Sequence, residues 1–287
     1  MHLNTVGEPW LQRYTSVLAA CTFLLVIAGG LVTSNDAALS VPDWPLSWGR
    51  VVPVLEGGIR YEFAHRAAAL VVTILTAMLA FRLRTASAWV ALGTVLTQAA
   101  LGGLLVRFLD PKGAAIVHAA LAQLFFGLTV MLWLGARTSW PARNGSVPPA
   151  PHLATIALFV QSVLGAAVRH GVLGPISHVG GAVIATGVVM WAAFPVLISE
   201  MENPTLRRPA MLLLSITFSQ IFLGIGAWMS RLANLDAPQP MPMMVLFTVA
   251  HVAVGALAFG ASIVLAKTLR HYAPASASIP REGMAAA

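Results

Sequence analysis

Long apolar stretches alternate with short polar segments along almost the whole chain of 287 residues. About 20 apolar residues are enough to cross the hydrocarbon core of a bilayer as a helix. The pattern therefore predicts an all-α fold, a polytopic membrane protein with eight transmembrane helices. The predicted spans are 14–34, 61–81, 86–106, 114–134, 152–169, 176–198, 208–230 and 244–266.

Composition supports this fold class and indicates an orientation. Hydrophobic residues make up 58% of the chain and charged residues 9%, whereas an ordinary soluble domain has about 25% charged residues. With the N-terminus inside, the cytoplasmic side holds ten of the seventeen lysines and arginines, as the positive-inside rule requires. We expect a multi-pass protein of a bacterial-type inner (plasma) membrane with both termini cytoplasmic. The basic charge then serves topology and anionic lipids, and no nucleic acid partner is expected.

Two patterns repeat along the chain and divide it into halves. Segments 98–102, 161–165 and 220–224 share the pattern Q-x-x-L-G in odd-numbered spans, where the first span offers only Gly29 and Gly30. Helix packing is the simpler interpretation of this pattern, and lining of a cofactor pocket is the alternative. The predicted organisation is an N-terminal four-helix bundle over 1–137, a cytoplasmic linker over 138–151, a C-terminal four-helix bundle over 152–272 and a cytoplasmic tail over 273–287.

Four histidines lie near the starts of the even-numbered spans. They are His65, His118, His178 and His251. A polar group in hydrocarbon is costly unless it is hydrogen-bonded, coordinated or facing a cavity, and four at matching depth favour axial ligation of haem iron, one imidazole on each face of the macrocycle. The pairs predicted are His65 with His118 and His178 with His251, one per bundle, toward the outer face.

Other interpretations of these histidines stay open. A single membrane histidine can be a satisfied hydrogen-bonding group or a proton relay, and a non-haem metal site would bring several carboxylates to its histidines. His170, next to Arg169, competes with His178 as a ligand, although His178 matches the other three in position. Candidate partners for haem propionates are arginines at the outer helix ends: Arg66, Arg107, Arg169 and Arg231.

Glu62 stands three residues before His65 and therefore on the same helix face. It is either a favourable anion at a helix N-terminus or a carboxylate for proton transfer and charge stabilisation beside a reactive haem. The second half has no carboxylate at the matching positions, so one site looks equipped for chemistry and the other for holding a cofactor. The segment from Thr33 to Arg60, rich in tryptophan and turn formers, is expected to cover the first bundle.

Several of these segments resemble the haem A synthase family. They are Gly29-Gly-Leu-Val-Thr-Ser34, Leu39-Ser-Val-Pro-Asp-Trp-Pro-Leu-Ser-Trp-Gly49, Glu62-Phe-Ala-His65-Arg66 and Leu164-Gly-Ala-Ala-Val-Arg-His170. The family oxidises a methyl group of haem O to the formyl group of haem A for cytochrome c oxidase. The resemblance implies substrate haem at His65 and His118, haem b at His178 and His251, and Glu62 as the catalytic carboxylate. It also implies contact with haem O synthase and oxidase assembly factors.

Two further classes of function compete with this one. A membrane protein that binds b-type haem for electron transfer or haem delivery would use the same histidine pairs without hydroxylation. A small-solute transporter built from two related bundles would use the histidines for proton coupling, but the spans offer few buried carboxylates and no obvious broken helices. The single cysteine, Cys21, excludes an internal disulfide and covalent haem attachment through C-x-x-C-H.

Overall fold

A computed structural model describes residues 8–109, 111–137, 149–232 and 240–272, and within them the chain forms eight α-helices. All eight are long and apolar enough to cross a membrane, which confirms the predicted fold class of a multi-pass all-α protein. The helices are α1 (Pro9–Ser34), α2 (Ile59–Leu83), α3 (Ala86–Arg107), α4 (Lys112–Gly135), α5 (Pro149–Arg169), α6 (Pro175–Ser199), α7 (Pro204–Leu232) and α8 (Pro242–Tyr272).

The helices extend beyond most of the predicted spans, because helical hydrogen bonding continues past the apolar residues into polar ends. One predicted boundary is wrong: the linker was expected to reach residue 151, but Pro149 already begins α5. Proline fits the first turn of a helix, where its missing N–H is not needed. The rest of the predicted linker, 138–148, and the predicted tail, 273–287, lie outside the described residues.

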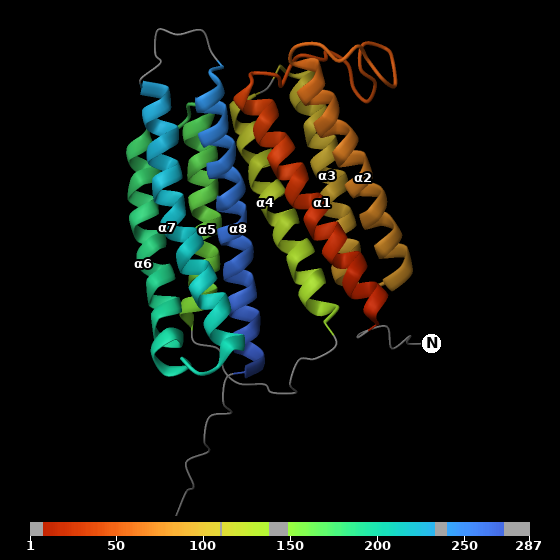
Figure 1. Cartoon of the computed structure of the whole chain (residues 1–287). Coiled ribbons are helices and arrows are strands. Elements are labelled where there is room, and N and C mark those ends of the chain that lie inside the picture. Colours follow the sequence, from red (N-terminus) through yellow and green to blue (C-terminus); the bar gives the residue numbers. More distant parts are fainter. Residues whose placement is uncertain (1–7, 110, 138–148, 233–239, 273–287) are drawn as a thin grey trace, which may run out of the picture.

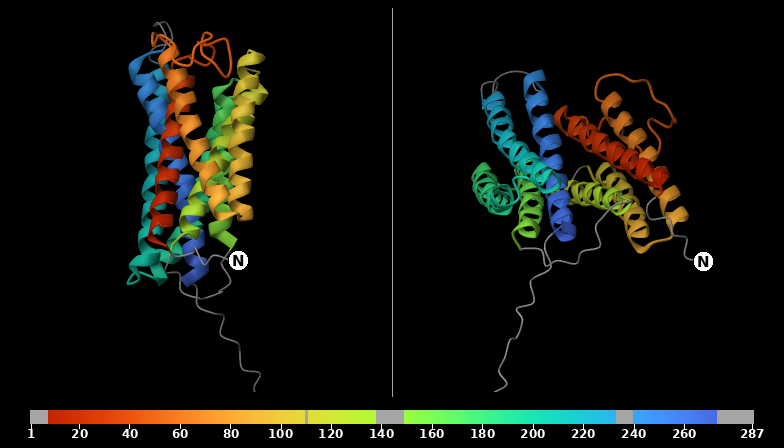
Figure 2. Two further views of the ribbon diagram at one scale, coloured as in Figure 1. Left: turned by 90° about the vertical axis from the view of Figure 1, so that its right-hand side faces the viewer. Right: turned by 60° about the horizontal axis from the view of Figure 1, so that its bottom comes forward.

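The helices form two four-membered groups that stand side by side (Figures 1 and 2). In the first group α1 contacts α2 and α4, and α3 contacts α2 and α4; the second group repeats this pattern with α5 to α8. No Cα atom of α2 lies within 8 Å of one in α4, and the same holds for α6 and α8. Each group is therefore a closed ring whose even-numbered helices lie diagonally opposite each other.

Tightly packed apolar side chains concentrate toward the end of each group at which α1 begins. In the first group this cluster includes Leu18, Val72 and Leu79, and in the second Val189 and Leu265, all at most 2% exposed. The even-numbered helices start at the other end, where residues 35–58 connect α1 to α2. Packing of the bundle is thus densest away from the four histidines.

The two groups meet where α1 contacts α8, α4 contacts α5 and α4 contacts α8, and the last of these contacts is reciprocal. A β-carbon placed on Gly127 would lie 2.8 Å from Cε1 of Phe259, and one placed on Gly260 would lie 3.2 Å from Cε1 of Phe126. Each phenylalanine therefore packs against the glycine of the opposite helix. The pair stands eight and nine residues after His118 in α4 and after His251 in α8, a repeat H-x₇-F-G that the sequence analysis missed and that relates the halves by approximate two-fold symmetry.

Replacing Gly127 with alanine should destabilise the contact between the halves. The new methyl group would force Phe259 to move, and overpacking of this kind costs about 1–3 kcal/mol. We expect a lower midpoint of thermal unfolding in detergent. The matched control is Gly93→Ala in α3, where a β-carbon meets no atom within 4 Å, so the midpoint should not fall. The same midpoint of thermal unfolding in the two variants would contradict the reciprocal packing.

Candidate functional site

Each of the four predicted histidines packs its imidazole against a glycine of the preceding helix. A β-carbon on the glycine would lie close to Cε1 of the ring. The distances are 3.2 Å for Gly29 and His65, 3.4 Å for Gly102 and His118, 3.0 Å for Gly165 and His178, and 3.1 Å for Gly224 and His251. The structure therefore contains four similar hairpins, in which the missing side chain of glycine lets the ring approach the neighbouring backbone.

The glutamines of the Q-x-x-L-G pattern hold the histidine helices in place. The Nε2 atom of Gln98 donates to the carbonyl oxygen of His118 at 2.8 Å, and that of Gln161 donates to the carbonyl oxygen of His178 at 2.9 Å. A β-carbon placed on Gly255 of α8 would lie 3.4 Å from Oε1 of Gln220. The bonds of Gln98 and Gln161 to backbone carbonyls favour the packing interpretation of the pattern, although Gln161 also reaches the ring of His178.

The Nδ1 atoms of the four imidazoles differ in their hydrogen bonding. Within the described residues, the Nδ1 atoms of His65, His118 and His251 are buried and have no hydrogen-bond partner. Only Nδ1 of His178 has one, the side chain of Gln161 at 3.0 Å. An unpaired buried polar group costs about 1–3 kcal/mol. Three of the four rings thus leave Nδ1 without a well-formed hydrogen bond, which weakens the interpretation of a satisfied hydrogen-bonding group.

The second pair of histidines faces across its bundle. The ring centroids of His178 and His251 lie 6.0 Å apart, with their planes at 85°. Two imidazoles on one metal ion, each with a metal–nitrogen distance of about 2.0–2.1 Å, would place their centroids at roughly this separation. The ring that faces His251 is that of His178. The residues at this site therefore fit two axial ligands of a haem.

The first pair lies on the corresponding diagonal helices, α2 and α4, with both rings against their glycines. Among the described residues no group of three or more His, Cys, Asp and Glu side chains is arranged to hold a metal ion. Pairs of histidines suit haem, since the porphyrin itself supplies the other iron ligands. The donor set fits haem better than a non-haem metal.

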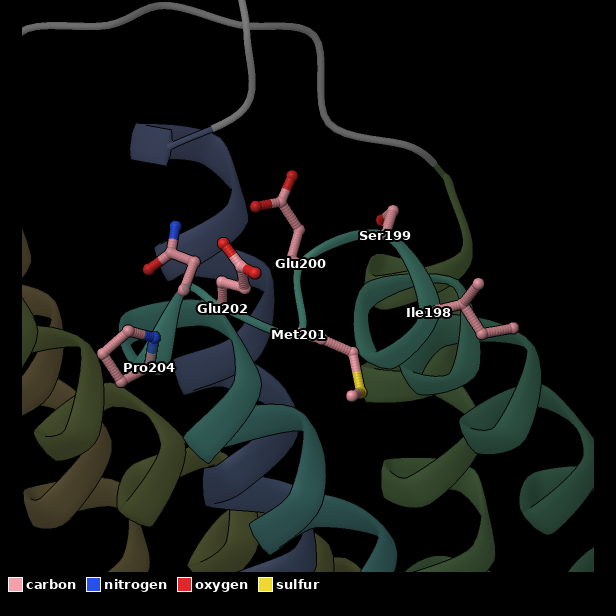
Figure 3. Close-up of a pocket in the computed structure, with 7 residues that line it drawn as sticks. Ile198, Ser199, Glu200, Met201, Glu202 and Pro204 are labelled. Atoms are coloured by element: carbon pink, nitrogen blue, oxygen red, sulfur yellow. The ribbon is translucent and has the colours of Figure 1, made fainter.

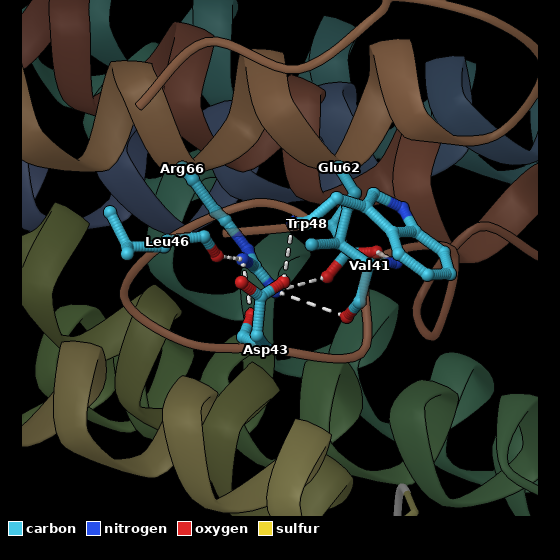
Figure 4. Close-up of polar contacts among 6 residues, drawn as sticks. All are labelled: Val41, Asp43, Leu46, Trp48, Glu62 and Arg66. Carbon is cyan, nitrogen blue, oxygen red and sulfur yellow. Dashed lines mark hydrogen bonds and ion pairs between the residues drawn. The ribbon is translucent and has the colours of Figure 1, made fainter. Parts of the chain in front are cut away.

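Glu62 is buried, with 4% of its surface exposed, and both of its oxygens are engaged (Figure 4). Oε1 forms an ion pair with Nη2 of Arg66 at 2.5 Å, and Oε2 accepts a hydrogen bond from the backbone N–H of Val41 at 2.8 Å. The carboxylate is therefore more than a favourable charge at a helix N-terminus. It joins the start of α2 to the segment that precedes it.

Arg66 makes further contacts to the same segment. Its Nη1 atom donates to the carbonyl oxygens of Asp43 at 2.8 Å and Leu46 at 2.9 Å (Figure 4). These bonds occupy the guanidinium, so the structure does not favour Arg66 as a propionate partner. Arg169 donates to the carbonyl oxygen of Thr33 at 2.6 Å and so ties α5 to the end of α1. Arg107 and Arg231 stay predictions for this role.

The segment held by Arg66 is ordered by hydrogen bonds of its own. The backbone N–H groups of Gly49 and Trp48 donate to the carboxylate of Asp43 at 2.7 and 2.6 Å. Together with the nearby charge of Arg66, these bonds hold the pKa of the Asp43 carboxyl below its ordinary value. The sequence analysis predicted a cover over the first bundle, but it did not find the role of Arg66 in holding it.

One surface depression lies away from the histidines. It has a volume of about 710 Å³ and is lined by residues 198–204 at the turn between α6 and α7 (Figure 3). This turn is at the opposite end of the bundle from the histidines. The carboxylates of Glu200 and Glu202 extend away from the helices (Figure 3). The depression takes no part in the histidine sites.

The sequence of the chain can be compared with those of known proteins. No family model matches the chain. Curated proteins named Heme A synthase match it, with 27% identity in Chelativorans sp., 30% in Mesorhizobium japonicum and 30% in Symbiobacterium thermophilum. The chain is similar to haem A synthases. The similarity covers 47% of the chain and 44% of the relative for the first two, and 42% of each for the third. The matched region thus spans less than half the length of these relatives. The identity within that region supports the predicted family resemblance.

If the second histidine pair binds haem, replacing Gly165 with alanine should weaken that binding. The methyl group would displace His178, and we expect the affinity for added haem b to fall about tenfold or more, since overpacking costs about 1–3 kcal/mol. The measurement is a haem titration followed by absorbance. Gly187→Ala in α6 is the control, because a β-carbon there meets no atom within 4 Å. Unchanged affinity in Gly165→Ala would argue against the glycine contact as a determinant of the site.

Proposed function

We propose that this protein is a membrane haem oxidoreductase that converts the methyl group of haem O to the formyl group of haem A for cytochrome c oxidase assembly. The observation that carries the proposal is the pair of diagonal histidine sites, each built on glycine contacts between helices. The similarity to proteins named Heme A synthase supports the same activity. Haem O is then the substrate, and the resident cofactor is haem b.

We assign the substrate haem to His65 and His118 and haem b to His178 and His251. The difference between the halves supports this assignment. The first pair lies next to a buried carboxylate and beneath an ordered segment, whereas the rings of the second pair face each other at 6.0 Å. A site that exchanges substrate needs access and chemical groups, and a site that keeps a cofactor needs mainly its ligands.

The reaction turns a methyl group into a formyl group. With water as the oxygen source, the methyl group and one water give the formyl group with release of four protons and four electrons, so an electron acceptor outside this chain is required. A bound haem iron would supply the oxidising chemistry that protein side chains lack. The protein contributes the histidine ligands, a low-water environment between helices, and the carboxylate of Glu62, three residues before His65, as the group that accepts a proton or stabilises positive charge. Arg66 fixes the position of that carboxylate.

Membrane orientation follows from the same arrangement. All four histidines lie toward the end of the bundle that carries residues 35–58, and we assign that end to the outer face because the opposite end bears most of the lysines and arginines. Both termini are then cytoplasmic in a plasma membrane of bacterial type. Haem O synthase and oxidase assembly factors are the proposed protein partners, and the lipid bilayer surrounds the helices.

A second candidate function is haem-dependent electron transfer or haem delivery without hydroxylation. It is favoured by the engagement of both oxygens of Glu62 in structural contacts, because such a carboxylate could serve only to hold the outer segment. The two candidates differ in product. Co-expression with a haem O synthase, extraction of the bound haems and mass analysis would show haem A for the synthase, and haem b or haem O alone for the second candidate.

The substitution Glu62→Gln tests the charge of this carboxylate at the first site. Glutamine has nearly the same shape and can still accept the hydrogen bond of Val41, but it carries no charge, and its NH2 group then faces Arg66, so the ion pair is lost. We expect both haems to remain bound and the yield of haem A to fall about 100-fold or more, as for loss of a general base. Glu56→Gln, the same change at an exposed position of the preceding segment, should leave the yield unchanged. Normal haem A formation by Glu62→Gln would remove the catalytic role of Glu62.

Replacing one histidine of each pair tests the assignment of the two haems. His118→Ala should lose bound haem O and all haem A formation while keeping the b-type spectrum. His251→Ala should lose the b-type spectrum because iron coordination at the second pair requires both rings. The measurements are the reduced-minus-oxidised spectrum and the masses of the extracted haems. If His118→Ala loses haem b and His251→Ala loses haem O, the assignment is reversed.

A further inference from the structure

The segment between α1 and α2, residues 35–58, is here called the outer loop, and it reaches from the first histidine of the first site toward the second. At one side it is held by Arg66, the residue that follows His65, through the carbonyl oxygens of Asp43 and Leu46. Between these two residues lies Trp44. The ring that coordinates the proposed substrate and the group that holds the loop are therefore neighbours on α2.

At its other side the outer loop contacts α3 through Trp44. A β-carbon placed on Gly103 would lie 2.9 Å from Cδ2 of the indole. Gly103 adjoins Gly102, the glycine against which His118 packs. Trp44 thus rests beside the support of the second histidine of the pair, while half of its own surface, 50%, stays exposed. Residues 43–46 of the outer loop therefore contact groups that adjoin both histidines of the first pair.

The second half has no equivalent of the outer loop in the connection at the matching place. Residues 170–174 join α5 to α6, and this short connection contains no tryptophan and no basic residue other than His170. The residue that follows His178 is Val179 rather than an arginine, and it is 61% exposed. Within the described residues, only the first histidine pair lies beside an arginine-anchored loop.

We propose that Arg66 and Trp44 are positioning residues that hold the outer loop over the first histidine pair and so control how long a substrate porphyrin stays bound there. This inference rests on the proposed function only in treating the first site as the exchanging one. Arg66 suits the task because its planar guanidinium presents several donors in a fixed geometry, here to two backbone carbonyls and to Glu62. Trp44 supplies the contact with α3 that closes the bridge.

The test measures the loss of haem from each site separately. The full-length protein in detergent is loaded with haem b as the probe at both sites and mixed with excess apomyoglobin, which captures released haem. Arg66→Gln and Trp44→Ala should each speed release from the first site about tenfold or more, equivalent to about 1.4 kcal/mol, without changing release from the second. His118→Ala and His251→Ala identify the kinetic phase of each site.

Two further variants show whether the effect is specific. Trp48→Ala changes the same residue type in the same loop, where the side chain is 58% exposed, and its release rates should match those of the unmodified protein. Arg66→Lys keeps the charge but not the planar set of donors, and its rate of haem release from the first site should lie between those of the unmodified protein and Arg66→Gln.

Limited proteolysis of the outer loop gives a readout that needs no haem, and cleavage should be faster in Arg66→Gln and Trp44→Ala.

The possible results separate this inference from the proposed function. Unchanged first-site release in Trp44→Ala, or equal acceleration of both phases, would overturn the role of the loop, and Trp44→Ala remains informative if Arg66→Gln does not fold. Haem bound at both sites without haem A formation would reject the synthase function and leave the release test valid. Absence of haem from the first site of the unmodified protein would overturn both.

Discussion

The site depends on one steric constraint: an imidazole at a close helix contact needs a facing residue without a side chain. Gly29, Gly102, Gly165 and Gly224 meet this need in four successive hairpins. A methyl group at any of these positions would lie 3.0–3.4 Å from Cε1 of the ring, a contact that the histidine can relieve only by moving. Because the spacing between the helices is set by this contact, the same glycines fix both the packing of each hairpin and the place of its histidine.

The closed ring of four helices determines how the hairpins combine. Adjacent helices pack directly, and the even-numbered helices are left on the diagonal, with no Cα atoms within 8 Å of each other. Their histidines therefore project from opposite sides. Tight apolar packing lies at the other end of each bundle, where it contributes stability without filling the level of the histidines. Packing and ligand binding are thus divided between the two ends of the same helices.

The halves differ where the proposed chemistry differs. Their contact is nearly symmetric, with Phe126 against Gly260 and Phe259 against Gly127. The first half adds the buried pair of Glu62 and Arg66 and the outer loop that they hold. A buried charge is tolerated only when it is paired and hydrogen-bonded, and here the partners are loop atoms. Loop position and carboxylate position consequently depend on each other, so a change in one should affect the other.

Hydrophobic pattern and charge determined a large part of this protein: the eight helices, the two halves, and the histidines proposed for each site, because segment length, periodicity and residue type are local properties of the chain. The spacing of Glu62 to His65 likewise made it a candidate, and its catalytic role stays a prediction. Only the tertiary structure decided that each ring packs on a glycine, that Pro149 already belongs to α5, and that Arg66 binds the loop instead of standing free. It also showed the 6.0 Å approach of His178 and His251. These features join residues far apart in the chain, and their distances follow from helix packing, which no local pattern specifies.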